Sequence, residues 1–284
     1  MRTTIRRRGA SALVLAALVS TVLTACGSDG EVKKPDLVEG AQQGGSLTIG
    51  ISYDEPGVGL EKNGSYSGFD VTTATYVAEA LGVDPADITW VRADPGEREK
   101  LLESGQADLV FATYSITDER KQVVDFAGPY FVAHQDLLIR RNDTEITGPK
   151  ALHGRVLCSV TGTTSSAYVK EHYKGDITLQ EYPRYSACVE ALLDGKVDAV
   201  TTDDLILAGY AAEDRYRGKL KVVGDGFTDE RYGVGVKKGD TALVEKVDAA
   251  LKQYVDDGSW RAALEQSVGG SGYDIPDPPT PGTA

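Results

Sequence analysis

Residues 47–51 read Leu-Thr-Ile-Gly-Ile, an apolar run with the length of one buried strand. Apolar side chains then recur at helical spacing over residues 70–81, which predicts a helix that covers this strand. The pattern repeats with a helix over 97–103, between strands over 88–91 and 108–112. Because strands that are apolar throughout are buried on both faces, the alternation predicts an α/β unit with helices on both sides of its sheet.

The same alternation returns in the second half of the chain. Four more strands are expected, over 156–160, 177–181, 198–201 and 220–223. Three helices are expected between and after them, over 165–172, 185–193 and 203–212. A second α/β unit, again with a mostly parallel sheet flanked by helices, therefore follows the first.

The last elements lead back to the first sheet. A strand over 233–236 and an amphipathic helix over 241–255 follow the second unit, and the first sheet is the natural surface for this helix to cover. Two antiparallel crossings between two lobes then form a two-strand hinge. The expected boundaries are 46–136 plus 233–268 for the first lobe, 141–228 for the second, and 136–140 and 229–233 for the crossings.

The N-terminal residues have the composition of an export signal. A basic stretch over 1–8 precedes an apolar run over 10–22 that is too short for a permanent membrane span. Leu23-Thr24-Ala25-Cys26 resembles a bacterial lipoprotein box, which implies a signal peptide over 1–25 and two acyl chains that anchor Cys26 to the outer face of the cell membrane. An ordinary secretory signal with a chance Cys is the alternative.

Flexible segments are expected at both ends of the folded part. Residues 26–45 are rich in Gly, Ser, Gln and charge and predict a tether behind the lipidated Cys. Residues 269–284 are rich in Gly and Pro and predict a loosely held tail.

Charge and cysteine content exclude some classes of partner. The formal net charge is −13, and removal of the arginines of the signal peptide leaves about −17, which repels nucleic acid. Besides Cys26, the chain has only Cys158 and Cys188. Export favours a disulfide between them, with two separate buried thiols as the alternative. Two Cys without matching His ligands make a poor metal site, and neither a metal nor another cofactor is expected.

Four motifs carry a resemblance to a known family. They are Ala112–Lys121 with the following Val123–Phe131, Gly68–Val71, Gly162–Ser165 and Asp198–Asp203. In this order and spacing they closely resemble the type II periplasmic amino-acid-binding proteins, over residues 45–266. The resemblance implies the two-lobed type II fold, a free amino acid held between closing lobes, and a monomer that delivers it to an ABC permease with its ATPase.

The resemblance assigns the two ends of the amino acid to opposite lobes. Arg120 would grip the α-carboxylate with its planar fork of donors, the alternative being a solvated charge at a helix start. Asp203 would accept the α-ammonium, the alternative being a helix N-cap, and it could do both.

Further residues are expected around the ligand. Ser115 offers a hydroxyl, the backbone at Ala112 and Thr113 offers donors and acceptors, and Thr163 and Thr164 open a helix whose N-terminus favours a carboxylate. Simple capping is the alternative for both threonines. Tyr53 stands where the family often stacks an aromatic ring over the ligand, and a core or surface role is equally compatible. Asp70 is interpreted mainly as a helix cap.

The stretches 49–57 and 158–210 are similar to glutamate-binding lipoproteins of high-GC Gram-positive bacteria, which favours glutamate. The side-chain carboxylate of glutamate needs a cation or several donors. Arg98 is the preferred candidate, and Lys62, Arg184 and His172 are weaker ones.

Other functions remain open at this point. The ligand could be glutamine, aspartate or another polar amino acid, and the chain could report its ligand to a sensor. An enzyme of the same fold, such as a small-acid dehydratase, is disfavoured because the three histidines have no obvious catalytic partners in the sequence.

Overall fold

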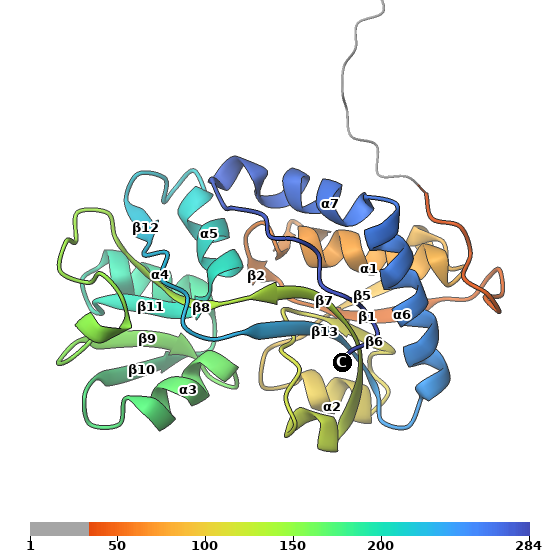
Figure 1. Cartoon of the computed structure of the whole chain (residues 1–284), viewed down its shortest axis with the longest axis horizontal. Helices are drawn as coiled ribbons and strands as arrows, with labels where there is room; N and C mark the ends of the chain where they lie inside the picture. Colours follow the sequence, from red (N-terminus) through yellow and green to blue (C-terminus); the bar gives the residue numbers. More distant parts are fainter. Residues whose placement is uncertain (1–33) are drawn as a thin grey trace, which may run out of the picture. The chain divides into compact units, whose positions relative to one another are not determined.

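The computed structural model describes residues 34–284. The signal peptide over 1–25 and the lipidated Cys26 expected from the sequence lie outside the described residues. Two five-stranded sheets organise the described part, and each is covered by helices on both faces (Figure 1).

The sheet of the first lobe has the strand order β5-β1-β6-β13-β7. Its strands are β1 (Leu47–Ile51), β5 (Ile88–Arg92), β6 (Leu109–Phe111), β7 (Val124–Ala133) and β13 (Glu230–Lys237). A small antiparallel sheet that the sequence analysis did not anticipate follows β1 and consists of β2 (Asp54–Glu55), β3 (Gly59–Lys62) and β4 (Ser65–Ser67).

Four helices cover the first sheet. One face carries α1 (Phe69–Ala80), α6 (Thr241–Asp256) and α7 (Ser259–Val268), and the other carries α2 (Arg98–Glu103) (Figure 1). Trp260 of α7 is buried and donates to the Tyr130 carbonyl at 2.7 Å, so the unanticipated α7 belongs to the core. The helices of the described part include none that is long and apolar enough to cross a membrane.

The sheet of the second lobe has the order β10-β9-β11-β8-β12. Its strands are β8 (Gln135–Arg140), β9 (Val156–Val160), β10 (Thr178–Tyr182), β11 (Ala199–Asp203) and β12 (Leu220–Val222). Two of its helices, α4 (Tyr185–Leu193) and α5 (Asp204–Ala212), pack on one face, and α3 (Thr164–His172) packs on the other. Four short 3₁₀ helices lie at Pro85–Asp87, Arg120–Gln122, Pro149–Ala151 and Gly269–Ser271.

Both sheets are mostly parallel as expected, with one strand of the five in each running against the other four. In the first, β1 pairs in parallel with β5 and β6, whereas β13 is antiparallel to β6 and β7. In the second, β9 pairs in parallel with β10 and β11, whereas β8 is antiparallel to β11 and β12. The reversed strands, β8 and β13, are the first strands that follow the two crossings between the lobes.

The crossings lie beside the expected positions. The first crossing is His134, because residues 136–140, expected as the link, pair within the second sheet as part of β8. The second crossing spans residues 223–229, because Glu230 already pairs with Ala133 in the first sheet. The two crossings run side by side, with the Phe227 amide donating to the Gln135 carbonyl at 2.9 Å.

Both segments expected to be flexible make defined contacts where they are described. Val38 of the expected tether is buried in the first core, and its amide donates to the Ala80 carbonyl at 2.9 Å. In the expected loose tail, the Thr283 amide donates to the Gly128 carbonyl at 2.9 Å. Composition alone misses these contacts because the described part of these segments contains no α-helix or strand, only the short 3₁₀ helix Gly269–Ser271.

Candidate functional site

A small polar cavity lies where the two lobes meet, beside the carboxyl ends of β1, β6, β9 and β11. This is the edge at which open α/β sheets bind their ligands. The first lobe contributes Glu55, Pro95, Arg98, Thr113 and Ser115 to the cavity. The second lobe contributes Thr163, Thr164, Ser165, Tyr185, Thr202 and Asp203.

Thr113 follows β6 in a backbone conformation that is rare for a β-branched residue, with φ +46°. Its amide donates to Asp70 Oδ2 at 2.8 Å, and its carbonyl accepts from Arg98 Nη1 at 3.4 Å. Asp70 is therefore a buried acceptor within α1 and not the helix cap that we expected; Gly68 occupies the cap position. Strained residues held in this way are typical of functional sites.

Arg98 is buried, with 3% of its surface exposed, and lines the cavity as predicted for a side-chain reader. Its Nη1 donates to the Ala112 carbonyl at 2.9 Å, and its Nε donates to the Pro95 carbonyl at 3.2 Å. The guanidinium also lies 4.4 Å from the centre of the Tyr114 ring, a favourable cation–π distance. These contacts hold the cation rigidly at one wall of the cavity.

Asp203 stands at the opposite wall, on the second lobe. It occupies the N-cap position of α5 but makes no capping bond with its side chain. Its carboxylate instead accepts from the Tyr232 hydroxyl at 2.5 Å and from Ser165 Oγ at 3.4 Å. Burial raises the pKa of Asp203 well above its ordinary value, and the nearby Glu230 adds to the rise.

Arg120 lies behind Ser115 and does not line the cavity. Its Nη1 donates to the Ser115 carbonyl at 2.7 Å, and its Nη2 donates to the Gly162 carbonyl of the second lobe at 3.2 Å. Burial and the charge of Arg98 lower the pKa of Arg120 to about 10, which still leaves it protonated at neutral pH. It is therefore a partly buried cation between the lobes and not the solvated charge that was the alternative.

The threonines and Ser115 join the lobes at the cavity. Ser115 Oγ lies 3.4 Å from Thr164 Oγ1, which donates to Glu230 Oε2 at 2.8 Å. Thr163 caps α3, its Oγ1 accepting from the Ser166 amide at 3.0 Å, so the capping alternative holds for this residue while it also lines the cavity.

The remaining predicted residues lie outside the cavity. The Ala112 carbonyl accepts from Arg98 Nη1 and from Thr113 Oγ1, and Ala112 does not line the cavity. Tyr53 donates to Asp94 Oδ1 at 2.7 Å within the first lobe. The weaker candidates Lys62, Arg184 and His172 are not among the lining residues either.

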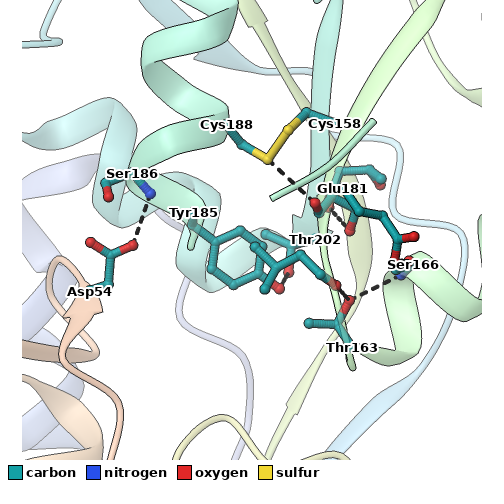
Figure 2. Close-up of a disulfide and its surroundings, with 12 residues drawn as sticks. Asp54, Cys158, Thr163, Ser166, Glu181, Tyr185, Ser186, Cys188 and Thr202 are labelled. Carbon is teal, nitrogen blue, oxygen red and sulfur yellow. Dashed lines mark hydrogen bonds between the residues drawn. A yellow bond between two sulfur atoms is a disulfide. The ribbon is translucent and has the colours of Figure 1, made fainter. Parts of the chain in front are cut away.

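Cys158 and Cys188 form the expected disulfide, which joins β9 to α4 within the second lobe. Figure 2 shows it beside Tyr185, the first residue of α4, whose hydroxyl accepts from Thr202 Oγ1 at 2.6 Å. The disulfide leaves both crossings between the lobes unconstrained. Among residues 34–284, no cluster of His, Cys, Asp or Glu side chains is arranged to hold a metal ion.

Sequence reasoning missed five lining residues, namely Glu55, Pro95, Ser165, Tyr185 and Thr202. Ser165 and Thr202 belong to motifs that carry the family resemblance, so their proximity to predicted site residues was the available signal, whereas Tyr185 only begins a predicted helix. Glu55 gave no such signal, since an acidic residue beside a proline is typical of an exposed turn.

Comparison with known families decides where the chain belongs. Residues 47–270 match the family described as bacterial extracellular solute-binding proteins, family 3. The chain belongs to this family. Membership confirms the resemblance found in the motifs, and it places this family 3 protein outside the cytoplasm.

Individual relatives extend the match over almost the whole chain. A glutamate-binding protein, GluB, of Corynebacterium efficiens is 41% identical over 273 residues, covering 92% of this chain and 91% of GluB. GluB of Corynebacterium glutamicum is also 41% identical, over 89% of this chain and 88% of that protein. The ABC transporter glutamine-binding protein GlnH of Bacillus subtilis is 32% identical, over 87% of this chain and 93% of GlnH.

Solved structures agree with the fold. An ancestral arginine-binding protein bound to arginine matches with a TM-score of 0.73 and 32% identity, over 80% of this chain and 99% of that one. An ancestral arginine-binding protein bound to glutamine matches with the same TM-score of 0.73 and 32% identity, over 80% of this chain and 100% of that one. The predicted two-lobed type II fold is confirmed for this family 3 protein.

Proposed function

We propose that this protein binds L-glutamate between its lobes and delivers it to an ABC importer. The observation that carries the proposal is the cavity itself, which sets the carboxyl of Asp203 on one lobe against the guanidinium of Arg98 on the other. A zwitterion with a second carboxylate matches this arrangement of charges. The two GluB proteins, at 41% identity, and the ABC glutamine-binding relative support the ligand class and the importer.

In this proposal each end of the ligand has its own partners. Asp203 accepts hydrogen bonds from the α-ammonium, and the positive charge of the ammonium then favours the ionised form of Asp203. Ser115 and the N-terminus of α3 at Thr163 and Thr164 bind the α-carboxylate, and Arg120, which lies behind Ser115, adds its positive charge to this side of the site. Arg98 binds the side-chain carboxylate. Because the ligand contacts both lobes, binding stabilises the closed form.

Calorimetric titration with glutamate, glutamine, aspartate and arginine tests the ligand. We expect glutamate to bind most tightly and Asp203→Asn to weaken it by about 10- to 100-fold, since a charge-assisted bond contributes about 1.5–3 kcal/mol. Asp214→Asn, on an exposed side chain of the same lobe, is the matched control and should bind normally. Tight binding of glutamine or arginine without binding of glutamate would overturn the assignment.

The anchor and the assembly state are also proposals. We infer that Cys26 carries lipid, so Cys26→Ser should release the protein from the membrane fraction into the medium. We also infer a monomer, checked by light scattering of the purified chain. Incubation with small hydroxy acids should show no turnover, because the protein is proposed to bind and not to react.

A further inference from the structure

Glu55 places a buried carboxyl in the cavity. Only 3% of its surface is exposed, and it lines the same cavity as Arg98 and Asp203. Its Oε1 lies 3.4 Å from Thr113 Oγ1, whereas its Oε2 has no hydrogen-bond partner among the described residues. Buried polar atoms are nearly always paired, so an orphan atom in a ligand cavity points to a contact that the ligand supplies.

The surroundings favour the neutral form of this carboxyl. No cation of the described residues forms an ion pair with Glu55; the bonds of Arg98 go to the carbonyls of Pro95, Ala112 and Thr113. An isolated buried carboxylate is strongly unfavourable, so such a group keeps its proton. The charged and titratable groups that act on Glu55 from the neighbouring elements are Asp70, Arg98, Tyr130, Tyr185, Asp203, Tyr210 and Tyr232.

We propose that Glu55 determines side-chain specificity, its protonated carboxyl donating from Oε2 to the side-chain carboxylate of glutamate beside Arg98. This inference rests on the proposed function and adds a second residue, besides Arg98, that recognises the side-chain carboxylate of the ligand. A neutral acid can donate to an anion, whereas an ionised Glu55 would repel it and would instead accept from the amide of glutamine. The protonation state of one side chain then sets the preference between two ligands of nearly the same shape.

The pH at which the preference changes follows from the same environment. Burial raises the pKa of Glu55 to about 8, and the neighbouring Asp70 adds to the rise. The free protein therefore holds Glu55 mostly protonated at about pH 7 and mostly ionised at about pH 9. Glutamate binding above pH 8 must take up a proton, so the ratio of glutamate to glutamine affinity should fall about tenfold between these values.

Calorimetric titration of the full chain with both ligands at about pH 6, 7, 8 and 9 tests this. The ratio of the two affinities removes effects on the α-ammonium and Asp203, because both ligands carry the ammonium. In two buffers of different ionisation enthalpy, glutamate should take up more protons than glutamine near pH 8. Glu55→Gln keeps a neutral donor and should abolish both the pH dependence and the extra proton uptake. Asp248→Asn, at a partly buried carboxyl on α6 away from the cavity, should leave both unchanged.

The outcomes separate this inference from the proposed function. A constant affinity ratio from pH 6 to 9 in the unaltered protein overturns the role of Glu55 while leaving glutamate as the ligand. So does a ratio that still falls in Glu55→Gln. Binding of glutamine but not glutamate at every pH overturns the proposed function itself. The profile of the unaltered protein keeps the test valid even where the variant folds poorly.

Discussion

At Thr113 a β-branched residue is held in a left-handed conformation by two charged side chains. Asp70 accepts from its amide at 2.8 Å, and Arg98 donates to the carbonyls on either side of it. Such a conformation costs about 1–3 kcal/mol and persists only when neighbours impose it. These three hydrogen bonds place the Thr113 side chain against Glu55, so the strained backbone orders the cavity wall that faces the ligand side chain.

Replacement of Arg98 by lysine tests whether its planar fork matters. Lysine keeps the charge but cannot reach two carbonyls and a ligand carboxylate at once. We expect glutamate affinity to fall about 10- to 100-fold, with a smaller loss for glutamine, measured by calorimetry. Arg92→Lys, at an exposed ion pair with Glu61, is the control and should bind normally. Equal losses for both ligands would contradict a side-chain role for Arg98.

Stability of the ligand-free protein should fall as the pH rises from about 5 to about 8. Burial raises the pKa of Asp70 to about 7 and of Glu55 to about 8, so the folded state binds protons that the unfolded state has already lost. For acids of this kind the stabilisation is complete below their ordinary pKa and is lost as the pH passes the folded value. We expect Tm to drop by about 5–10 °C over this range.

The matched variant for this measurement is Glu55→Gln, which should be more stable than the unaltered protein at about pH 8 and nearly equal to it at about pH 5. Well below pH 4 the trend should reverse, because hydrogen bonds from Lys170 and Ser166 lower the pKa of Glu181. A Tm that stays constant from pH 5 to 8 would show that these carboxyls do not titrate as proposed.

At the scale of single residues, the family resemblance pointed to Asp203 and to the segment that contains Thr113, and both residues line the cavity. Arg98 was chosen on chemistry alone and also lines it. Glu55 could not be found this way, because its burial depends on the small β2–β4 sheet folding over the end of β1. Arg120 was expected to contact the ligand directly, and only the structure reveals that its donors reach the Ser115 and Gly162 carbonyls.

At the scale of elements, α5 of the second lobe approaches the first lobe at a glycine. A methyl group on Gly209 would lie 1.9 Å from the Pro56 carbonyl oxygen, far inside contact distance. Gly209 is in the helix interior, where alanine would otherwise stabilise by about 1 kcal/mol. Its place is therefore explained by the close approach of the two lobes and not by helix formation.

Gly209→Ala should hold the lobes apart. We expect about a tenfold or greater loss of affinity for every ligand, because the closed form becomes strained, while Tm without ligand is unchanged or higher. Calorimetry and thermal unfolding measure the two effects. Gly270→Ala is the control, since a methyl there meets no heavy atom within 4 Å. Normal affinity in Gly209→Ala would mean that binding does not require this closed arrangement.

The disulfide should contribute to stability more than to binding. It closes a loop of 30 residues within the second lobe, for which chain entropy predicts about 3–4 kcal/mol. Double replacement of Cys158 and Cys188 by serine should lower the free energy of unfolding by about that amount. Glutamate affinity should change less than about twofold, because Tyr185 is still held by Thr202 and neither crossing is touched. A large loss of affinity would show that the bond positions α4 for the ligand.

Prediction of elements succeeded for the short, mainly apolar strands. It failed for β7 and β8, the two strands on either side of the first crossing between the lobes. The runs of β1, β6, β9 and β11 were found within about two residues. The long β7 and its continuation β8 were missed because Gly128, Pro129 and His134 interrupt their pattern. The reversed direction of β8 in its sheet is a feature of the chain path between the lobes, which local periodicity does not report.

The whole molecule is held closed by contacts around the cavity as well as within it. On one side the Ser186 amide donates to Asp54 Oδ2 at 2.9 Å (Figure 2). The Tyr210 hydroxyl also reaches Asp54. On the other side Arg120 donates to the Gly162 carbonyl. In the centre Tyr232 donates to Asp203. Closure is thus an equilibrium that residues without ligand contact can shift.

Asp54→Ala tests that equilibrium. Asp54 does not line the cavity, so its loss should lower the population of the closed form without altering any ligand contact. Apparent affinity falls in proportion to the population of the closed form. We expect a fall of about 5- to 20-fold from loss of the Asp54 hydrogen bonds. The fall should be equal for glutamate and glutamine. Asp257→Ala is closely matched, because Asp257 accepts from the Tyr76 hydroxyl at 2.6 Å and the Ser259 amide at 2.8 Å within one lobe, and it should bind both ligands normally. A loss confined to one ligand would place Asp54 in recognition and not in closure, whereas a matching loss in the control would attribute the effect to general destabilisation.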